Sequence, residues 1–127
     1  MSEEELLRFV SEMEGAYYDY PFDEDFETAI FRRKDTKKWF GALLYAPNDK
    51  LSLQPKGGKT RVLNVKVPPE LGVILKENYA GVLNAYHMNK THWVSVLLSA
   101  DVSREEIEKL LALSFELTGK RSKHERL

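Results

Sequence analysis

Residues 27–45 read ETAIFRRKDTKKWFGALLY, and this stretch decides the fold. In its first part, Glu27–Lys34, side chains of an extended chain alternate, so that small and aromatic residues such as Phe31 share one face. The second part, Lys38–Tyr45, is rich in the aromatic and aliphatic residues that strands favour. The polar residues Asp35–Lys37 between them suit a turn. The stretch therefore predicts two antiparallel strands joined as a hairpin.

The residues on either side of this hairpin predict three helices and three further strands. Apolar residues at helical spacing predict a first helix, which ends at Gly15. The remaining predicted elements are strands at Arg61–Val67, Val82–Tyr86 and His92–Ser99, a helix that begins at Pro68-Pro69 and ends near Asn78, and a helix from Ser103 to Gly119. Two stretches without periodicity, Tyr17–Asp25 and residues 46–60, are predicted as loops.

These elements predict one α+β domain over residues 1–119, followed by a frayed tail at residues 120–127. We expect two layers, a five-stranded antiparallel sheet with the helices packed on one face, in the order αβββαββα. The chain of 127 residues is 43% hydrophobic and 31% charged, which is ordinary for a globular domain.

Composition excludes several classes of protein and site. The chain has no cysteine, which excludes disulfide scaffolds, thiolate metal sites and cysteine nucleophiles. No apolar stretch approaches the ~20 residues that a membrane-spanning helix needs. The sequence begins MSEEELLRF, which is acidic where a secretion signal would be basic and then apolar. We therefore expect a cytoplasmic protein with no membrane partner.

Charge is balanced overall at −1 but not along the chain. Residues 1–30 contain ten acidic residues and one basic residue, whereas residues 31–66 contain ten basic residues and two acidic ones. One interpretation is that the basic block contacts an anionic partner such as DNA. The other is that the two blocks lie close together and neutralise each other, or are simply solvated.

The basic block is densest around the predicted hairpin turn. Five cations, Arg32, Arg33, Lys34, Lys37 and Lys38, lie next to the aromatic residues Trp39 and Phe40. A basic two-stranded ribbon can enter the major groove of DNA, and these residues are candidate nucleic-acid contacts. Exposed lysines also protect edge strands from aggregation, and that role needs no ligand.

The second cluster is the segment Tyr86–Trp93, YHMNKTHW, at the predicted tip of the last hairpin. Two histidines without a third ligand do not make a zinc site, and no catalytic or cofactor motif accompanies them. We therefore predict no catalytic residue, no metal and no cofactor. The segment either shapes a turn around core residues or recognises an anionic ligand. The candidate nucleic-acid contacts here are His87, Asn89, Lys90, His92 and Trp93.

The same residues carry a family resemblance. The motifs are Tyr20-Pro21-Phe22, Asn64-Val65-Lys66 followed by Pro69-Glu70-Leu71, and Tyr86-His87-Met88-Asn89-Lys90 followed by His92-Trp93. With them the chain resembles the MmcQ/YjbR family from its first helix to Leu117. The resemblance implies a two-layer fold similar to secretion-chaperone-like domains, and DNA binding through a double-wing arrangement of strands. It implies no catalytic residue set.

Two functions follow as hypotheses. The first is DNA binding through the basic hairpin and the YHMNKTHW turn. The alternative is a protein-binding, peptide-binding or homodimerising module that binds no nucleic acid, since oppositely charged segments permit self-complementary association. An enzyme for a small anionic substrate ranks third, and it would need a deep pocket that holds both His87 and His92 together with an acidic residue from Asp19–Asp25.

Overall fold

The structure, a computed structural model, describes residues 1–119. Within them the elements are α1 (Glu3–Glu12), β1 (Ala16–Asp19), β2 (Ala29–Arg33), β3 (Trp39–Pro47), a 3-10 turn η1 (Asn48–Lys50), β4 (Lys59–Lys66), α2 (Pro69–Asn78), β5 (Val82–Asn84), β6 (Trp93–Leu97) and α3 (Arg104–Leu117). The predicted tail at residues 120–127 lies outside the described residues. No helix in the described part of the chain is long and apolar enough to cross a membrane.

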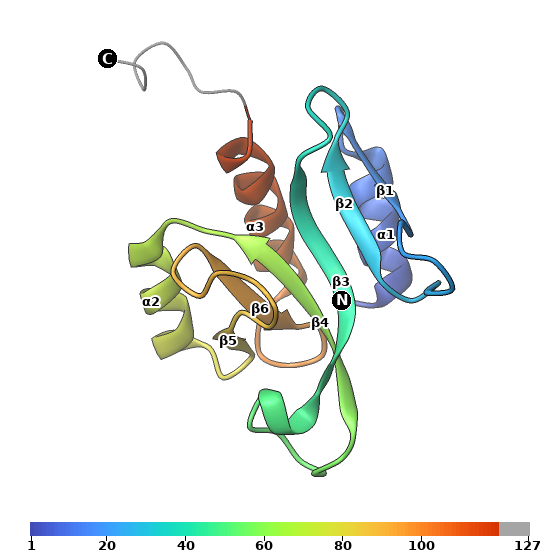
Figure 1. Ribbon diagram of the computed structural model, residues 1–127. Helices are drawn as coiled ribbons and strands as arrows, with labels where there is room; N and C mark the ends of the chain where they lie inside the picture. Colours follow the sequence, from blue (N-terminus) through green and yellow to red (C-terminus); the bar gives the residue numbers. More distant parts are fainter. Residues whose placement is uncertain (120–127) are drawn as a thin grey trace.

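The six strands form one antiparallel sheet in the order β1-β2-β3-β4-β6-β5 (Figure 1). The α+β class and the antiparallel sheet are as predicted, but the prediction of five strands in the order αβββαββα is wrong. The additional strand is β1, in the stretch predicted as a loop. Its four residues pair with β2, where Tyr17 lies opposite Arg32 and Tyr18 opposite Phe31. Such a short edge strand is stabilised by its neighbour and leaves little periodicity in the sequence.

Strand lengths also differ from the prediction. β3 and β4 pair as far as Pro47 and Lys59, so the predicted loop at residues 46–60 is shorter by several residues. β5 ends at Asn84 rather than Tyr86. The strand ends there because the backbone N–H of Tyr86 donates to the side-chain Oγ of Ser95 at 2.9 Å instead of to a backbone carbonyl of β6.

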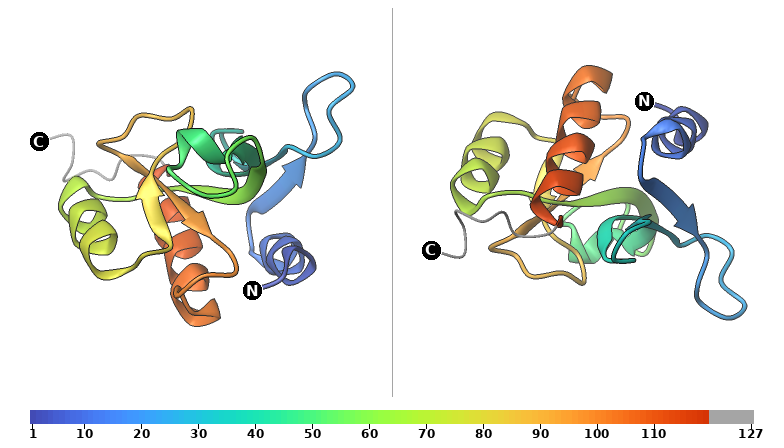
Figure 2. Two further views of the ribbon diagram at one scale, coloured as in Figure 1. Left: turned by 90° about the horizontal axis from the view of Figure 1, so that it is seen from below. Right: turned by 90° about the horizontal axis from the view of Figure 1, so that it is seen from above.

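All three helices pack on one face of the sheet, as predicted (Figure 2). Their amphipathic stripes bury apolar side chains against alternate residues of the central strands, which is how a two-layer domain forms its core. The buried side chains on this side include Leu6 and Val10 of α1, Leu75 of α2, and Ile107 and Leu111 of α3, which pack with Phe31, Leu63, Val65 and Val96 of the sheet.

A β-bulge between β2 and β3 places Trp39 and Phe40 on opposite faces of the sheet. Phe31 pairs with Gly41, but Arg32 pairs with Trp39, so Phe40 is the additional residue. Phe40 turns to the helix side and is fully buried there, 6.1 Å from the Phe31 ring by centroids. Trp39 therefore shares the opposite face with Arg32.

Candidate functional site

The face of the sheet opposite the helices, here called the helix-free face, forms the floor of a cavity. Its central residues Ile30, Ala42 and Asn64 are buried although no helix covers them. Two loops, residues 20–28 and 85–92, lie on this side instead (Figure 2). The cavity has a volume of about 480 Å³, which is within the usual range for small-molecule sites.

Aromatic side chains form the walls of this cavity. Phe22 of loop 20–28 meets Trp39 of β3 edge to face, with ring centroids 6.2 Å apart. On the side of loop 85–92, Tyr86 and His87 line the cavity, and their ring centroids are 3.9 Å apart. Such walls favour a flat ligand, because aromatic faces bind other π-systems and apolar surface.

A buried hydrogen-bond network fastens loop 85–92 to the sheet. Asn64 Nδ2 donates to the carbonyl oxygen of Tyr86 at 2.9 Å. Ser95 Oγ donates to Asn64 Oδ1 and accepts from the backbone N–H of Tyr86. Asn64 and Ser95 are 1% and 0% exposed, so these bonds satisfy polar groups that no water reaches. The start of the loop is thereby fixed over the floor of the cavity.

Of the predicted contact residues in this loop, His87 lines the cavity, whereas Lys90 lines a separate pocket that also includes His87. His87 is exposed, and its φ of +64° places it in the left-handed region that few side chains adopt. Lys90 Nζ donates to the carbonyl oxygen of Ala85 at 3.0 Å. That bond holds the ammonium beside the loop and leaves its other two donors for a ligand.

The other three predicted contact residues of this loop, Asn89, His92 and Trp93, do not line the cavity. Asn89 Oδ1 accepts from the backbone N–H groups of Thr91 and His92, at 2.8 and 3.1 Å, which shapes the turn into β6. His92 is exposed and is not among the residues that line the cavity. Trp93 is partly buried and begins β6. The turn-forming interpretation of the segment therefore describes Asn89 well.

The two arginines of the predicted basic ribbon turn to opposite faces of the sheet. Arg32 Nε binds Asp19 Oδ1 at 3.0 Å, across the β1–β2 pair. Arg33 forms two bonds with the Asp35 carboxylate, each 3.0 Å long. Arg33 also donates to the carbonyl oxygen of Phe115, near the end of α3. Both guanidinium groups are thus bound within the protein.

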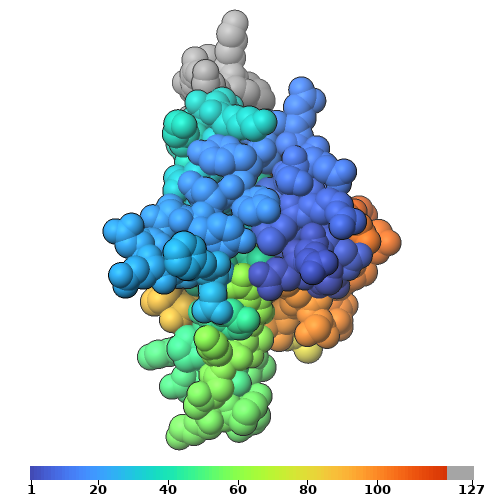
Figure 3. Space-filling model, turned by 90° about the vertical axis from the view of Figure 1, so that its right-hand side faces the viewer, coloured from blue at the N-terminus to red at the C-terminus, as the bar shows by residue number. Residues whose placement is uncertain are grey.

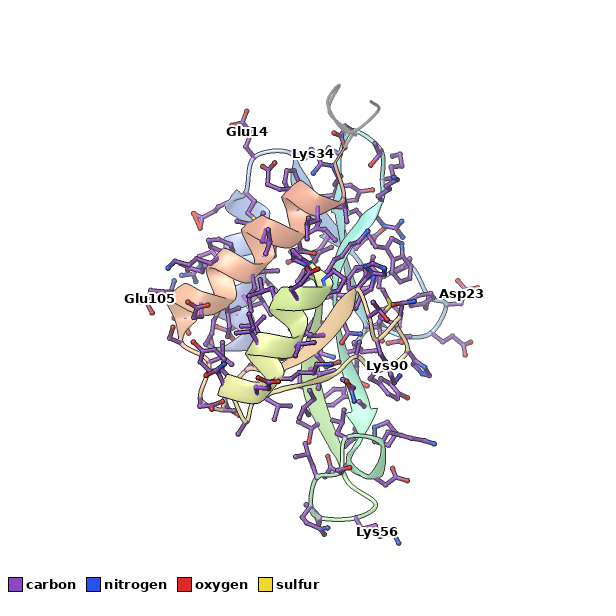
Figure 4. All side chains as sticks on the ribbon, turned by 90° about the vertical axis from the view of Figure 1, so that its left-hand side faces the viewer. Glu14, Asp23, Lys34, Lys56, Lys90 and Glu105 are labelled. Atoms are coloured by element: carbon purple, nitrogen blue, oxygen red, sulfur yellow. The ribbon has the colours of Figure 1, made fainter. Side chains whose placement is uncertain are left out.

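The lysines of the ribbon remain available. Lys34, Lys37 and Lys38 are exposed and form no ion pair with any residue in the range 1–119. Figure 4 shows Lys34 at one end of the molecule and Lys56 at the other, with Lys90 between them on the helix-free side. The hairpin turn and loop 85–92 are therefore separate basic groups rather than one patch.

The acidic and basic blocks are partly neutralised within the chain. Three ion pairs join them, namely Asp19 with Arg32, Glu27 with Lys59, and Glu3 with Arg61. The first and third bring the positive block against α1 and β1. This supports the interpretation in which the two blocks lie close together, and it reduces the charge left for a partner.

Loop 20–28, which projects from the body of the molecule (Figure 3), supplies part of the cavity lining. The sequence predicts an acidic residue from Asp19–Asp25 in such a pocket, but it does not predict Phe22 there. Asp25 lines the cavity, and its Oδ1 accepts from the backbone N–H groups of Glu27 and Thr28 at 2.9 Å each. A hydrogen bond from the Thr28 side chain, together with these backbone bonds, lowers the pKa of Asp25. The Tyr20-Pro21-Phe22 motif was the available signal, since Phe22 is a wall residue.

The cavity holds one imidazole, that of His87, and one carboxylate, that of Asp25. His92 is not a lining residue, so the pocket that would bring both histidines together is not formed by residues 1–119. Within that same range, no three His, Asp or Glu side chains are grouped closely enough to hold a metal ion.

The comparison with protein families gives a match to the YjbR family model over residues 11–117. The chain belongs to the YjbR family. A curated relative, the uncharacterized protein YyaQ of Bacillus subtilis, is 35% identical over 118 residues, which cover 93% of this chain and 98% of YyaQ. Its name assigns no activity.

Solved structures show the same fold for this YjbR chain. A crystal structure of a Pseudomonas syringae protein has a TM-score of 0.86 and 32% identity, covering 94% of this chain and all of that one. A Deinococcus radiodurans protein with a DUF419 domain has a TM-score of 0.71 and 27% identity, covering 97% of this chain and 83% of that one.

Proposed function

We propose that this YjbR-family chain binds DNA through the helix-free side of its sheet. The observation that carries the proposal is the placement of lysines that form no ion pair within residues 1–119, with Lys90 on loop 85–92 and Lys34 at the hairpin turn (Figure 4). Lysine contacts to phosphates supply much of the affinity of DNA-binding proteins. The proposal is of binding rather than catalysis.

The contacts differ from those expected from the sequence. Lys34, Lys37 and Lys38 would contact phosphates from the hairpin turn, and Lys90 and His87 would contact phosphate or base edges from loop 85–92. Arg32 and Arg33 support the hairpin instead, because their guanidinium groups bind carboxylates of the protein itself. His92 and Trp93, which do not line the cavity, are left out of the proposed contacts.

A salt titration of DNA binding tests the proposal. We expect binding by fluorescence anisotropy at low ionic strength, weakening linearly in log K against log salt. Lys90→Ala and Lys34→Ala should each reduce the slope by about 1, the loss of one phosphate contact. Lys56→Ala removes the same charge from the far end of the molecule and should leave the slope unchanged. No binding at low salt, or equal effects of all three variants, would refute the proposal.

A protein-binding or self-associating module is the second candidate. Val73 and Ile74 on α2 are each 53% exposed, which is high for apolar residues of this size. Sedimentation across micromolar concentrations separates the two candidates. A concentration-dependent dimer that Ile74→Lys abolishes, with no DNA binding, would favour this alternative.

A further inference from the structure

Aromatic rings dominate the walls of the cavity on the helix-free face. These rings belong to Phe22, Trp39, Tyr45 and Tyr86. The face of an aromatic ring is electronegative, so it attracts cations as well as apolar groups. Cages of such rings bind quaternary ammonium groups in proteins. The volume of about 480 Å³ leaves room for a trimethylammonium group and the chain that carries it.

The charged groups at the cavity are mainly acidic. Among the lining residues, Asp25 is the only carboxylate and His87 the only side chain that can become cationic. A second recess adjoins the cavity, since Asp25 and Thr28 line both, and it adds Glu24 and Glu27. A hydrogen bond from the Thr28 side chain, together with backbone N–H groups, lowers the pKa of Asp25, so its carboxylate is ionised at neutral pH.

Three cations of the protein lie close to two of the aromatic walls, and each has a carboxylate partner. They lie 4.4–5.8 Å from the ring centroids of Trp39 or Tyr45, so these rings already attract positive charge. The ion pairs are Arg32 with Asp19, Lys59 with Glu27, and Arg61 with Glu3. Of the acidic lining residues, Glu24 and Asp25 form no ion pair within residues 1–119. The net charge around the cavity is therefore negative, which favours a cationic ligand.

The cavity offers few hydrogen-bond acceptors to such a ligand. Both ends of the buried Asn64 side chain already bond to the protein. Oδ1 of Asp25 accepts the backbone N–H groups of Glu27 and Thr28. A primary ammonium has three N–H donors that need acceptors, whereas a quaternary ammonium has none and presents methyl groups to its surroundings. The lining therefore suits the quaternary group better.

We propose that this cavity binds a quaternary ammonium group, with its methyl groups against the aromatic rings and its charge balanced by the Asp25 carboxylate. A free choline-like molecule and the trimethylated lysine side chain of another protein carry this same group, and the test separates them. The inference is separate from the proposed DNA binding, because the lysines proposed to contact phosphates do not line the cavity.

The test compares choline with its neutral analogue 3,3-dimethyl-1-butanol, which has the same shape, by calorimetry without DNA. At about pH 8, above the range in which histidines usually titrate, the charge of the ligand is the main variable. We expect choline to bind at least about tenfold more tightly. Choline should also change the tryptophan fluorescence. Trp39→Phe should abolish that change, whereas Trp93→Phe should keep it, since Trp93 does not line the cavity.

Asp25→Asn is the decisive variant, because the asparagine Oδ1 can still accept the two backbone bonds. It should lower the affinity for choline about tenfold and leave that for the neutral alcohol unchanged. Asp23→Asn removes the same charge from the same loop, but Asp23 lines neither the cavity nor the adjoining recess. This control should bind choline as the unaltered protein does.

Two peptides, one with a central trimethyllysine and one with lysine in its place, identify the source of the ligand. Tighter binding of the trimethylated peptide than of choline assigns the cavity to a modified protein, and the reverse order assigns it to a free small molecule. Three results would overturn the inference: choline binding no tighter than the neutral alcohol, an unmodified peptide binding as tightly as the trimethylated one, or no binding of either quaternary ligand. All three leave the result of the DNA titration unaffected.

Discussion

Replacement of Ser95 by alanine should release loop 85–92 from the sheet. In the folded protein the Ser95 hydroxyl donates to Asn64 Oδ1 and accepts from the backbone N–H of Tyr86. The substitution leaves the buried Asn64 Oδ1 and the N–H of the half-buried Tyr86 without this partner. An unsatisfied buried polar group costs about 1–3 kcal/mol, so the free energy of unfolding should fall by about 2–4 kcal/mol.

The assay is urea unfolding combined with hydrogen exchange of backbone amides. Ser114→Ala is the matched control, because Ser114 Oγ also bridges two groups, donating to the carbonyl oxygen of Phe40 and accepting from the N–H of Lys66 on the helix side. We expect both variants to lose stability by a similar amount. The Tyr86 amide should lose its local protection only in Ser95→Ala.

Two results would contradict this reasoning. One is a loss of stability below about 0.5 kcal/mol in Ser95→Ala, which would mean that the buried groups find other partners. The other is equal protection of the Tyr86 amide in the two variants. Either result would show that the network does not hold the loop over the cavity.

Three further predictions concern other parts of the fold. Gly41→Ala should lower stability by about 1–3 kcal/mol in thermal or urea unfolding, because the new Cβ would lie 2.8 Å from Cδ2 of the buried Phe31 ring; a change under 0.5 kcal/mol would show that the ring moves aside. Glu3→Ala should lower the free energy of unfolding by about 1–3 kcal/mol, because it removes the ion-pair partner of Arg61, whose Nε and Nη1 are already buried without a hydrogen-bond partner among the described residues. Arg61→Met removes those buried polar groups together with the charge and should lower it by less. The reverse order of the two variants in urea unfolding would refute this reasoning. The Arg33 guanidinium lowers the pKa of Asp35 to about 2. The unfolded chain therefore binds more protons than the folded one, and stability should fall as pH drops from about 4 to 2. Asp35→Asn should make that fall in stability shallower, and an unchanged pH profile in this variant would count against the ion pair.

The sequence predicts those parts of the fold where local pattern and tertiary structure agree. Alternation in residues 27–45 identifies the central hairpin, and Pro68-Pro69 marks the start of α2 correctly. β1 could not be predicted in the same way, because its four residues are ordered by pairing with β2 rather than by any period of their own.

The candidate site shows the same distinction. The residues of loop 85–92 are recognisable from their chemistry, but the cavity also needs Asp25 and Phe22, about sixty residues earlier in the chain. Only the fold of the sheet brings the two loops to one face. The opposite directions of Arg32 and Arg33 likewise depend on alternation in β2, which a count of charges does not reveal.

Because the helices bury only one face of the sheet, most residues that stabilise the fold differ from those that would touch a ligand. Side chains such as Phe22, Asp25 and His87 could be randomised in a library while the hydrophobic layer beneath stays intact. Asn64 and Ser95 are the exception and would have to be kept in every member. The scaffold should therefore accept new specificities with little loss of folded yield.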